Sequence, residues 1–271
     1  MTDAETQRSA LAAPLTLPCG VELKNRIAKA AMSDSLGDGR GDATKAQRRL
    51  YRLWAEGGVA LSLIGEVQTS PDYPEKPGNL VLFEGADTDA LAALADAGRA
   101  HGAALWPQLG HAGALADRSV SRPRGPSPLE LPELKCEGMS RAEIEALPGA
   151  YARAATLAKA LGFGGVQIHA GHGFLFSQFL SPLFNHREDE FGGDAAGRFR
   201  IIGATIDAVR AAVGPAFPIG IKINSSDGLA GGVTEDQALE VVRLLDRTSV
   251  DLIDVSGGAY FPGAAASSDN P

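Results

Sequence analysis

The chain has 271 residues, of which 44% are hydrophobic and 21% charged, and its formal net charge is −8. This length suffices for one large domain or two small ones, and the composition is ordinary for a globular protein. The negative charge argues against binding to nucleic acid, which needs a basic surface, and no apolar run is long enough to span a bilayer.

The amino terminus and the cysteines indicate a cytoplasmic protein. The opening stretch, MTDAETQRSALAAP, has no basic segment followed by an apolar one, so we expect no secretory signal. Cys19 and Cys136 form neither a CxxC pair nor a disulfide framework, which suits a reducing compartment.

Apolar periodicity predicts a chain in which strands and helices alternate. A hairpin over residues 15–25 comes first. Strands are expected over residues 26–32, 59–67, 103–109, 165–169, 218–223 and 251–255. Helices are expected over residues 43–57, 87–101, 197–213 and 235–247, and from Ser140 onward, while the proline-rich residues 111–139 are expected to form a long loop.

Three of these elements carry specific signals. The helix over residues 43–57 places Leu50, Leu53 and Trp54 on one face, which we expect to be buried. The helix that begins after Ser140 has a Ser-x-x-Glu capping box. Pro107 disfavours the third strand, because proline cannot donate a ladder hydrogen bond.

Strand and helix alternation predicts a parallel sheet with helical crossovers. A dinucleotide-binding sheet should carry Gly-x-Gly-x-x-Gly after its first strand, and the glycines of GDGRGD at residues 37–42 have a different spacing. Unusual residues instead follow the carboxyl ends of successive strands, as in a barrel with its active site on that face. These residues are Met32, Ser33, Gly65, Glu66, Gln108, His169, His172, Lys222 and Ser256 to Gly258.

The predicted fold class is therefore α/β, a TIM (β/α)8-type barrel that forms a single domain over residues 1–271. Such a barrel has eight strands, and six are recognised here. Either two strands escape the pattern, or the chain lacks the last two βα units, whose loops commonly hold a cofactor phosphate.

Motifs at these strand ends occur in a family-specific order. The longest is IHAGHGFLFSQFLSPLFNHREDEFGG, and shorter ones are NRIAKAAMS, DYPEKPGNLVL, QLGHAG and GIKINSSD. With these motifs the chain resembles the Old Yellow Enzyme family of flavin-dependent NAD(P)H oxidoreductases over residues 15–260. The resemblance implies a barrel that binds FMN, takes hydride from NADH or NADPH, and reduces an electron-poor alkene or similar acceptor.

The resemblance assigns the catalytic role to two histidines. His169 and His172 are expected to donate hydrogen bonds to a substrate carbonyl, where negative charge develops as hydride arrives. From the residues alone, a pair of satisfied loop histidines and a zinc pair are alternatives. No third ligand is placed to complete a zinc site, so we expect no metal.

The resemblance implies that seven positions contact FMN. Gln108 offers a donor and an acceptor to the pyrimidine edge of the flavin, and Lys222 supplies positive charge where the family often has arginine. Either residue alone is also typical of a polar strand end. The other positions are Ala31, Met32, Ser33, Gly65 and Glu66. Packing alone also explains Ala31 and Met32, and Glu66 is unexpectedly large and charged.

Phe174 is the main departure from the family, which commonly has a tyrosine proton donor at this position. A phenyl ring cannot donate a proton. Water or another hydroxyl, such as that of Tyr260, is then the proton source, or the acceptor needs no proton at that position.

Three functional hypotheses follow. The first is an FMN-dependent ene-reductase whose partner is a small molecule with an activated carbonyl or similar group, with a homo-oligomer left open. The second is a truncated, non-catalytic barrel fragment with weak or no FMN binding, whose open sheet edges invite pairing with another chain. The third is a flavin-free lyase with Lys222 as a Schiff-base lysine, which the family motifs disfavour.

Overall fold

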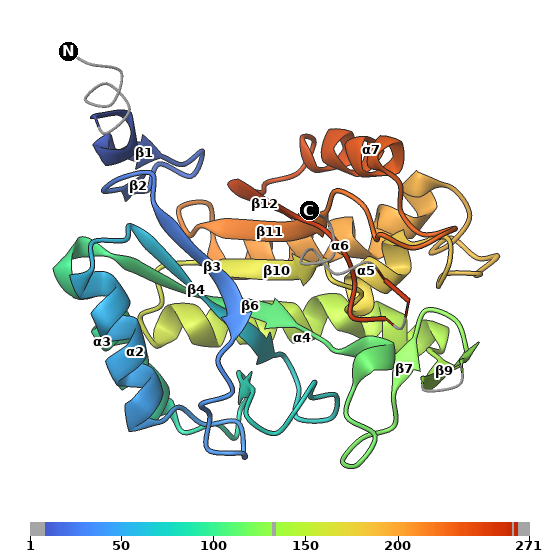
Figure 1. Cartoon of the computed structure of the whole chain (residues 1–271), viewed down its shortest axis with the longest axis horizontal. Helices are drawn as coiled ribbons and strands as arrows, with labels where there is room; N and C mark the ends of the chain where they lie inside the picture. Colours follow the sequence, from blue (N-terminus) through green and yellow to red (C-terminus); the bar gives the residue numbers. More distant parts are fainter. Residues whose placement is uncertain (1–8, 132–133, 262, 265–271) are drawn as a thin grey trace.

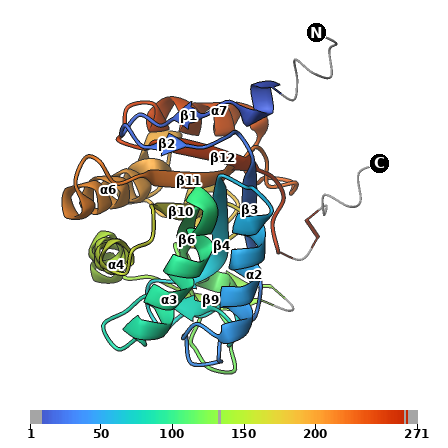
Figure 2. The same cartoon turned by 90° about the vertical axis from the view of Figure 1, so that its left-hand side faces the viewer.

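The computed structural model describes residues 9–131, 134–261 and 263–264. A curved parallel sheet runs through the molecule (Figure 1), and helices are arranged around its outer face (Figure 2). Within the described residues, no helix is both long and apolar enough to cross a membrane.

Six parallel strands follow one another in space in the same order as in the sequence. They are β3 (Ala28–Ser33), β4 (Leu61–Gln68), β6 (Ala104–Gly110), β10 (Val166–Ala170), β11 (Ile219–Asn224) and β12 (Leu252–Ser256). A short strand, β5 (Leu80–Val81), pairs with the end of β4. Sequential parallel strands with outer helices are the arrangement of a (β/α) barrel, so the predicted fold class is confirmed as an incomplete barrel.

Helices connect these strands on the outside of the sheet. They are α2 (Lys45–Glu56), α3 (Thr88–Gly98), α4 (Arg141–Ala160), α6 (Ala195–Val213) and α7 (Glu235–Leu245), with 3-10 turns η1 (Ala100–Gly102) and η2 (Gly113–Leu115) beside β6. The capping box predicted at Ser140 is present, because its hydroxyl accepts from the Glu143 backbone and Glu143 reaches back to Ser140. A short helix, α5 (Leu175–Leu180), was not predicted.

The predicted hairpin is confirmed as β1 (Leu15–Thr16) and β2 (Glu22–Leu23), which pair antiparallel. Its Leu17 and Leu23 pack with Leu61, Leu63 and Trp106 of the sheet. The hairpin therefore closes the end of the sheet at which the strands begin, opposite the end that carries the unusual residues.

The prediction of a long loop over residues 111–139 is wrong. This segment contains β7 (Arg124–Gly125), β8 (Leu129–Glu130) and β9 (Lys135–Gly138), which form a small separate sheet. The strands are too short for alternation to reveal them, and their pairing is between segments that only the fold brings together.

The buried face of α2 also differs from the prediction. Leu53 is 52% exposed and Trp54 40% exposed, whereas Gln47 and Tyr51 are buried. The Gln47 amide and the Tyr51 hydroxyl both donate to the Asp34 carboxylate just beyond β3. A polar partner at the strand end therefore decides which face of the helix turns inward, and apolar periodicity cannot register it.

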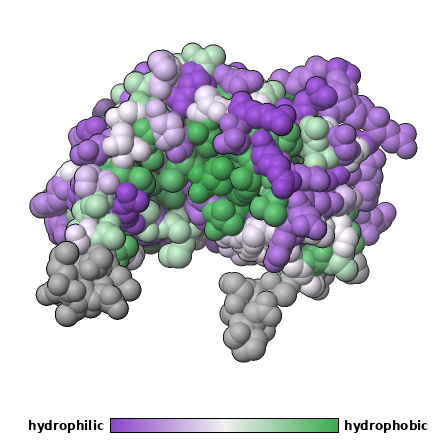
Figure 3. Space-filling view, turned by 90° about the horizontal axis from the view of Figure 1, so that it is seen from above, coloured by the Kyte–Doolittle hydropathy of each residue, from purple (hydrophilic) through white to green (hydrophobic). Residues whose placement is uncertain are grey.

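The two outermost strands, β3 and β12, leave apolar side chains in solvent. Met32 on β3 is 64% exposed and Val255 on β12 is 61% exposed. On the face seen from above, apolar surface gathers in the middle and polar side chains border it (Figure 3). Strands of a parallel sheet are ordinarily covered on both faces, so these edges differ from the interior of the sheet.

Candidate active site

The inner face of the curved sheet is apolar where the strands begin and polar where they end. Leu63, Trp106 and Leu252 belong to the apolar cluster beneath. Because strand side chains alternate between faces, the next inward positions on β6, β10, β11 and β12 are Gln108, Gln167, Lys222 and Asp254.

These four side chains form one hydrogen-bonded layer. Gln108 Nε2 donates to Gln167 Oε1 at 2.7 Å, and Gln167 Nε2 donates to Asp254 Oδ2 at 3.0 Å. The Lys222 ammonium lies 3.2 Å from the same carboxylate oxygen. Gln108, Gln167 and Lys222 are buried, so the layer offers polar groups in a place from which water is largely excluded.

Lys29 on β3 adds a second ammonium beside this layer. Its Nζ donates to the Leu63 carbonyl at 3.0 Å and lies over the ring of Tyr51. Burial, with a smaller contribution from the nearby charge of Lys222, lowers the pKa of Lys29 to about 8. Lys29 therefore titrates closer to neutrality than an ordinary lysine.

The end of β4 bulges at Gly65 and Glu66. Pairing of β4 with β6 shifts register between Ile64 and Val67, and Glu66 has a left-handed backbone with φ 37°. A Cβ on Gly65 would lie 2.2 Å from the Met32 backbone carbon, so β3 and β4 approach each other as only glycine allows. The bulge turns the Glu66 side chain inward, where it is buried.

Glu66 begins a chain of polar contacts that crosses the top of the site. Its carboxylate contacts His169 Nδ1. His169 Nε2 lies 3.3 Å from His172 Nδ1, and His172 Nε2 lies 2.7 Å from the Ser256 hydroxyl. The structure thus brings together both predicted histidines and one residue predicted to contact FMN.

His172 is held in an unusual conformation. Its φ is 59°, and its backbone N–H donates to Asn224 Oδ1 at 2.9 Å. Burial, with smaller effects from His169 and Lys222, lowers the pKa of His172 to about 3. The ring is therefore neutral at pH 7 and carries a single N–H.

The three predicted residues of β3 do not share a face. Ala31 packs against the apolar cluster under the polar layer, and Ser33 donates to Glu75 Oε2 at 2.9 Å. The Met32 side chain lies on the opposite face of the strand, exposed. Only the backbone of Met32 is available to the inner face.

Phe174 lies directly beside the histidines. It is fully buried, and its ring centroid is 4.7 Å from that of His169. The Tyr260 ring, 5.8 Å from both Phe174 and His172, is 67% exposed. The Tyr260 backbone N–H donates to the His172 carbonyl at 3.0 Å, whereas no hydrogen bond joins the Tyr260 hydroxyl to either histidine side chain among the described residues.

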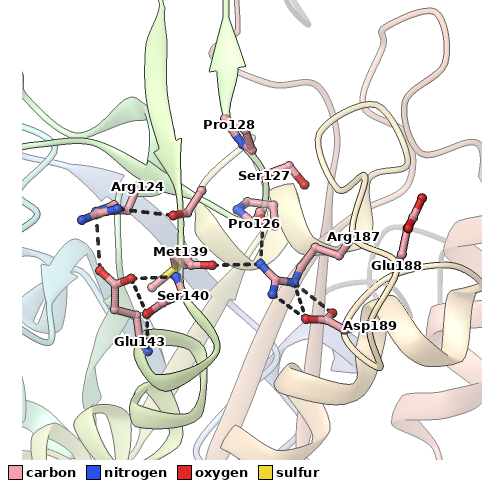
Figure 4. A pocket seen from close by; sticks show the side chains of 11 residues that line it. Arg124, Pro126, Ser127, Pro128, Met139, Ser140, Glu143, Arg187, Glu188 and Asp189 are labelled. Carbon is pink, nitrogen blue, oxygen red and sulfur yellow. Dashed lines mark hydrogen bonds and ion pairs between the residues drawn. The ribbon is translucent and has the colours of Figure 1, made fainter.

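A separate polar pocket of about 670 Å³ lies between the β7–β9 segment and the loop after α5 (Figure 4). At its centre Arg187 donates to the Pro126 and Met139 carbonyls, each at 2.9 Å, and pairs with Asp189, whose pKa it lowers. The Arg-x-Asp part of the family motif therefore has a structural role. It ties the β7–β9 segment to the loop after α5.

Several residues of the site were not predicted. They are Lys29, Gln167 and Asp254. Gln167 and Asp254 lie one inward position before His169 and Ser256 on their strands, and Lys29 lies on β3 two residues before the predicted Ala31. Period-two spacing from His169 identifies Gln167, and spacing from Ser256 identifies Asp254. Among the described residues, no group of three or more potential ligands is arranged to hold a metal ion.

The fold and the site define a (β/α) barrel with a polar site at the carboxyl ends of its strands, and comparison with known proteins identifies its family. Residues 10–269 match the model of the NADH:flavin oxidoreductase / NADH oxidase family. Because this match covers nearly all of the sequence, the chain belongs to that family. FMN, with NADH or NADPH as hydride donor, is therefore its expected cofactor set.

Relatives of several kinds are 32% to 34% identical to this chain over the aligned residues. An NADH-dependent flavin oxidoreductase of Neonectria sp. is 34% identical over 91% of this chain and 35% of the relative. Another, of Aspergillus parasiticus, is 32% identical over 87% of this chain and 58% of the relative. An NADPH dehydrogenase of Geobacillus thermodenitrificans is 33% identical over 90% of this chain and 72% of the relative. The chain spans less than two thirds of the two fungal relatives.

Solved structures share the barrel. A 2-naphthoyl-CoA reductase in complex with 2-naphthoyl-CoA superposes with a TM-score of 0.88 at 27% identity, covering 95% of this chain and 42% of that one. An Old Yellow Enzyme homologue from Zymomonas mobilis gives 0.82 at 22% identity, covering 93% and 74%. At 22% identity, the likeness to the Zymomonas mobilis structure concerns the fold alone.

Proposed function

We propose that this chain carries the catalytic face of an FMN-dependent oxidoreductase that uses NADH or NADPH to reduce an electron-poor alkene or similar acceptor. One observation carries the proposal. The buried layer of Gln108, Gln167 and Lys222 lies directly below His169 and His172, at the carboxyl end of a parallel barrel sheet, where such barrels have their active sites.

The donor set suits the ring portion of FMN. The Gln108 carboxamide can both donate to and accept from a pyrimidine edge, and the Lys222 ammonium favours a negative charge beside it. When bound, FMN supplies the hydride chemistry. The side chains around it orient the acceptor, exclude water and place hydrogen-bond donors where the acceptor gains negative charge.

Asp254 changes the electrostatics of this cradle. Its carboxylate neutralises Lys222 at 3.2 Å, so the pair brings almost no net charge. Lys29 pairs with Ser62 on β4, and its ammonium lies between the Leu63 carbonyl and the Tyr51 ring. Its charge still interacts with that of Lys222, so we infer that both lysines contribute to the positive potential that a reduced flavin needs.

The test is binding and reduction of FMN by the purified chain. We expect a yellow protein that is bleached anaerobically by NADH or NADPH and recoloured by an enone. Gln108→Leu should weaken FMN binding at least about tenfold, the effect of one lost hydrogen bond to a buried group, while Gln237→Leu on α7 leaves it unchanged.

Other results would favour the alternatives. A colourless protein that takes up no added FMN contradicts the proposal and supports a non-catalytic barrel fragment. Borohydride trapping of a carbonyl compound on Lys222 would support a Schiff-base lyase.

A further inference from the structure

The contacts from Glu66 to Ser256 have a direction that depends on one proton. With Glu66 ionised and both imidazoles neutral, the carboxylate can only accept, so His169 carries its single proton on Nδ1. His169 Nε2 then accepts from His172 Nδ1, and His172 Nε2 accepts from the Ser256 hydroxyl. The N–H groups of both His169 and His172 then donate within this series of hydrogen bonds, and neither is left for a substrate carbonyl.

Protonation of Glu66 reverses every step. The carboxyl O–H donates to His169 Nδ1, His169 Nε2–H donates to His172 Nδ1, and His172 Nε2–H donates to the Ser256 hydroxyl oxygen. A proton added at Glu66 therefore creates an N–H donor on His172 Nε2, which a substrate carbonyl can accept in place of Ser256. Two neutral imidazoles are required for this transfer, and the low pKa of His172 keeps it neutral.

We propose that Glu66, His169 and His172 form a proton relay that delivers a proton from the Glu66 carboxyl to the carbonyl oxygen of the substrate. This inference rests on the proposed function. As hydride adds to the β-carbon, the His172 Nε2–H bond breaks and an O–H bond forms on the enolate oxygen. The electron pair stays on Nε2. His169 Nε2 then gives its proton to His172 Nδ1, and Glu66 gives its proton to His169 Nδ1. The product leaves as an enol, which becomes the ketone in water.

Three observations on different elements support the relay. Glu66 and His172 both have left-handed backbones, a conformation that costs on the order of 1 kcal/mol and that persists where the surroundings demand it. Gln68 Nε2 holds the second carboxylate oxygen at 2.8 Å. Phe174, packed against His169, offers no proton of its own.

Other titratable groups around the relay do not replace Glu66. The Tyr151 hydroxyl is buried without a partner among the described residues, and burial and the charge of Glu66 raise its pKa well above the usual value. Lys222, which faces His172 from β11, is paired with Asp254. His172 is half-buried. Solvent therefore reprotonates the relay through His172 after the product leaves.

The first test needs no flavin. Side-chain 15N NMR of the purified chain near pH 8 should show both His169 and His172 protonated on Nδ1. In Glu66→Gln, the glutamine oxygen keeps its bond from Gln68 and its amide faces His169, so His172 should move its proton to Nε2. Glu84→Gln, which replaces an exposed carboxylate outside the relay, should change the tautomer of neither ring. An unchanged His172 tautomer in Glu66→Gln overturns the relay.

The second test uses the FMN-loaded protein and two acceptors. Reoxidation by an enone should slow about 100-fold in Glu66→Gln, the usual range for loss of a general acid. Reoxidation by ferricyanide, which takes electrons and no proton, should slow far less than reoxidation by the enone. Equal slowing with both acceptors overturns the relay. Failure of the wild-type protein with both acceptors instead contradicts the proposed function and leaves the NMR result to decide the relay.

The third test distinguishes oxygen from carbon as the site of protonation. An enone with an α-methyl group, reduced in D2O, should give product with no stereochemical preference at the α-carbon, since an enol ketonises in solution. Phe174→Tyr, which places a hydroxyl beside the substrate, should introduce a preference and restore the enone rate of the Glu66→Gln variant. A single α-stereoisomer from the wild-type protein contradicts delivery to oxygen.

Discussion

The Lys222 ammonium and the Asp254 carboxylate face each other at 3.2 Å across neighbouring strands of the barrel. Gln167 donates to the same carboxylate, so Asp254 contacts both the Lys222 ammonium and the Gln167 amide. Asp254 was not predicted from the sequence, yet it determines how much positive potential Lys222 can offer to a ligand.

Asp254→Asn is expected to raise the reduction potential of bound FMN. The amide oxygen can still accept from Gln167, but Lys222 is no longer neutralised and stabilises the anionic reduced flavin. A gain of about 1.4 to 2.8 kcal/mol corresponds to roughly 30 to 60 mV for two electrons. Equilibrium titration with a reference dye measures the potential. Asp246→Asn, an exposed carboxylate next to α7, is the matched control, and an unchanged or lower potential in Asp254→Asn contradicts the expectation.

His111 should make the fold sensitive to acid. Its Nδ1 accepts from the Gly113 N–H at 2.9 Å, and burial lowers its pKa to about 4. The unfolded chain, with a pKa near 6.5, binds this proton more readily, so the stabilisation is present above pH 6.5 and is lost as the pH falls through 4. The free energy of unfolding should lose about 2 kcal/mol from this residue between pH 7.5 and pH 5.

Urea unfolding of His111→Gln at the two pH values measures this contribution. The variant should lose less stability than the wild-type chain on acidification. Replacement of exposed His101 by glutamine should leave the loss of stability between the two pH values as large as in the wild-type chain. His172 acts in the same direction, so some acid sensitivity should persist. A pH dependence identical in His111→Gln and wild type would show that His111 is not the cause.

Arg187→Lys should loosen the β7–β9 segment. A lysine cannot replace both hydrogen bonds to the Pro126 and Met139 carbonyls while holding Asp189. Loss of hydrogen bonds from a charged donor predicts about 2 to 4 kcal/mol of destabilisation. Urea unfolding gives the value, and limited proteolysis should show earlier cleavage within residues 124–140. Glu188→Gln, exposed beside it, should change stability by less than about 0.5 kcal/mol.

Gly65→Ala should be strongly destabilising although it adds a single methyl group. The new Cβ would lie 2.2 Å from the Met32 backbone carbon, so β3 and β4 must separate, at a cost of roughly 1 to 3 kcal/mol. In contrast, Gly149→Ala inside α4 meets only the end of the flexible Arg153 side chain and should be neutral or stabilising. Thermal unfolding of both variants makes the comparison, and equal melting temperatures would show that the bulge can relax.

Much of the fold follows from the sequence. The six strands, the hairpin and the long helices all lie close to their predicted bounds, because apolar periodicity and capping residues are local signals. The prediction for α2 is wrong at Leu53 and Trp54, since the orientation of that helix depends on the distant Asp34 carboxylate. The small sheet of residues 124–138 depends likewise on pairing between segments that carry no strand pattern of their own.

For the site, the sequence by itself determined the family and the position of the two histidines, because the motif around His169 is contiguous. Only the tertiary structure decided that Glu66, 103 residues before His169, contacts it, and that Asp254 neutralises Lys222. The physical reason is the same in both cases. Parallel strands bring their carboxyl ends to one edge, and a bulge of one residue on β4 decides whether a carboxylate faces the site or the helices.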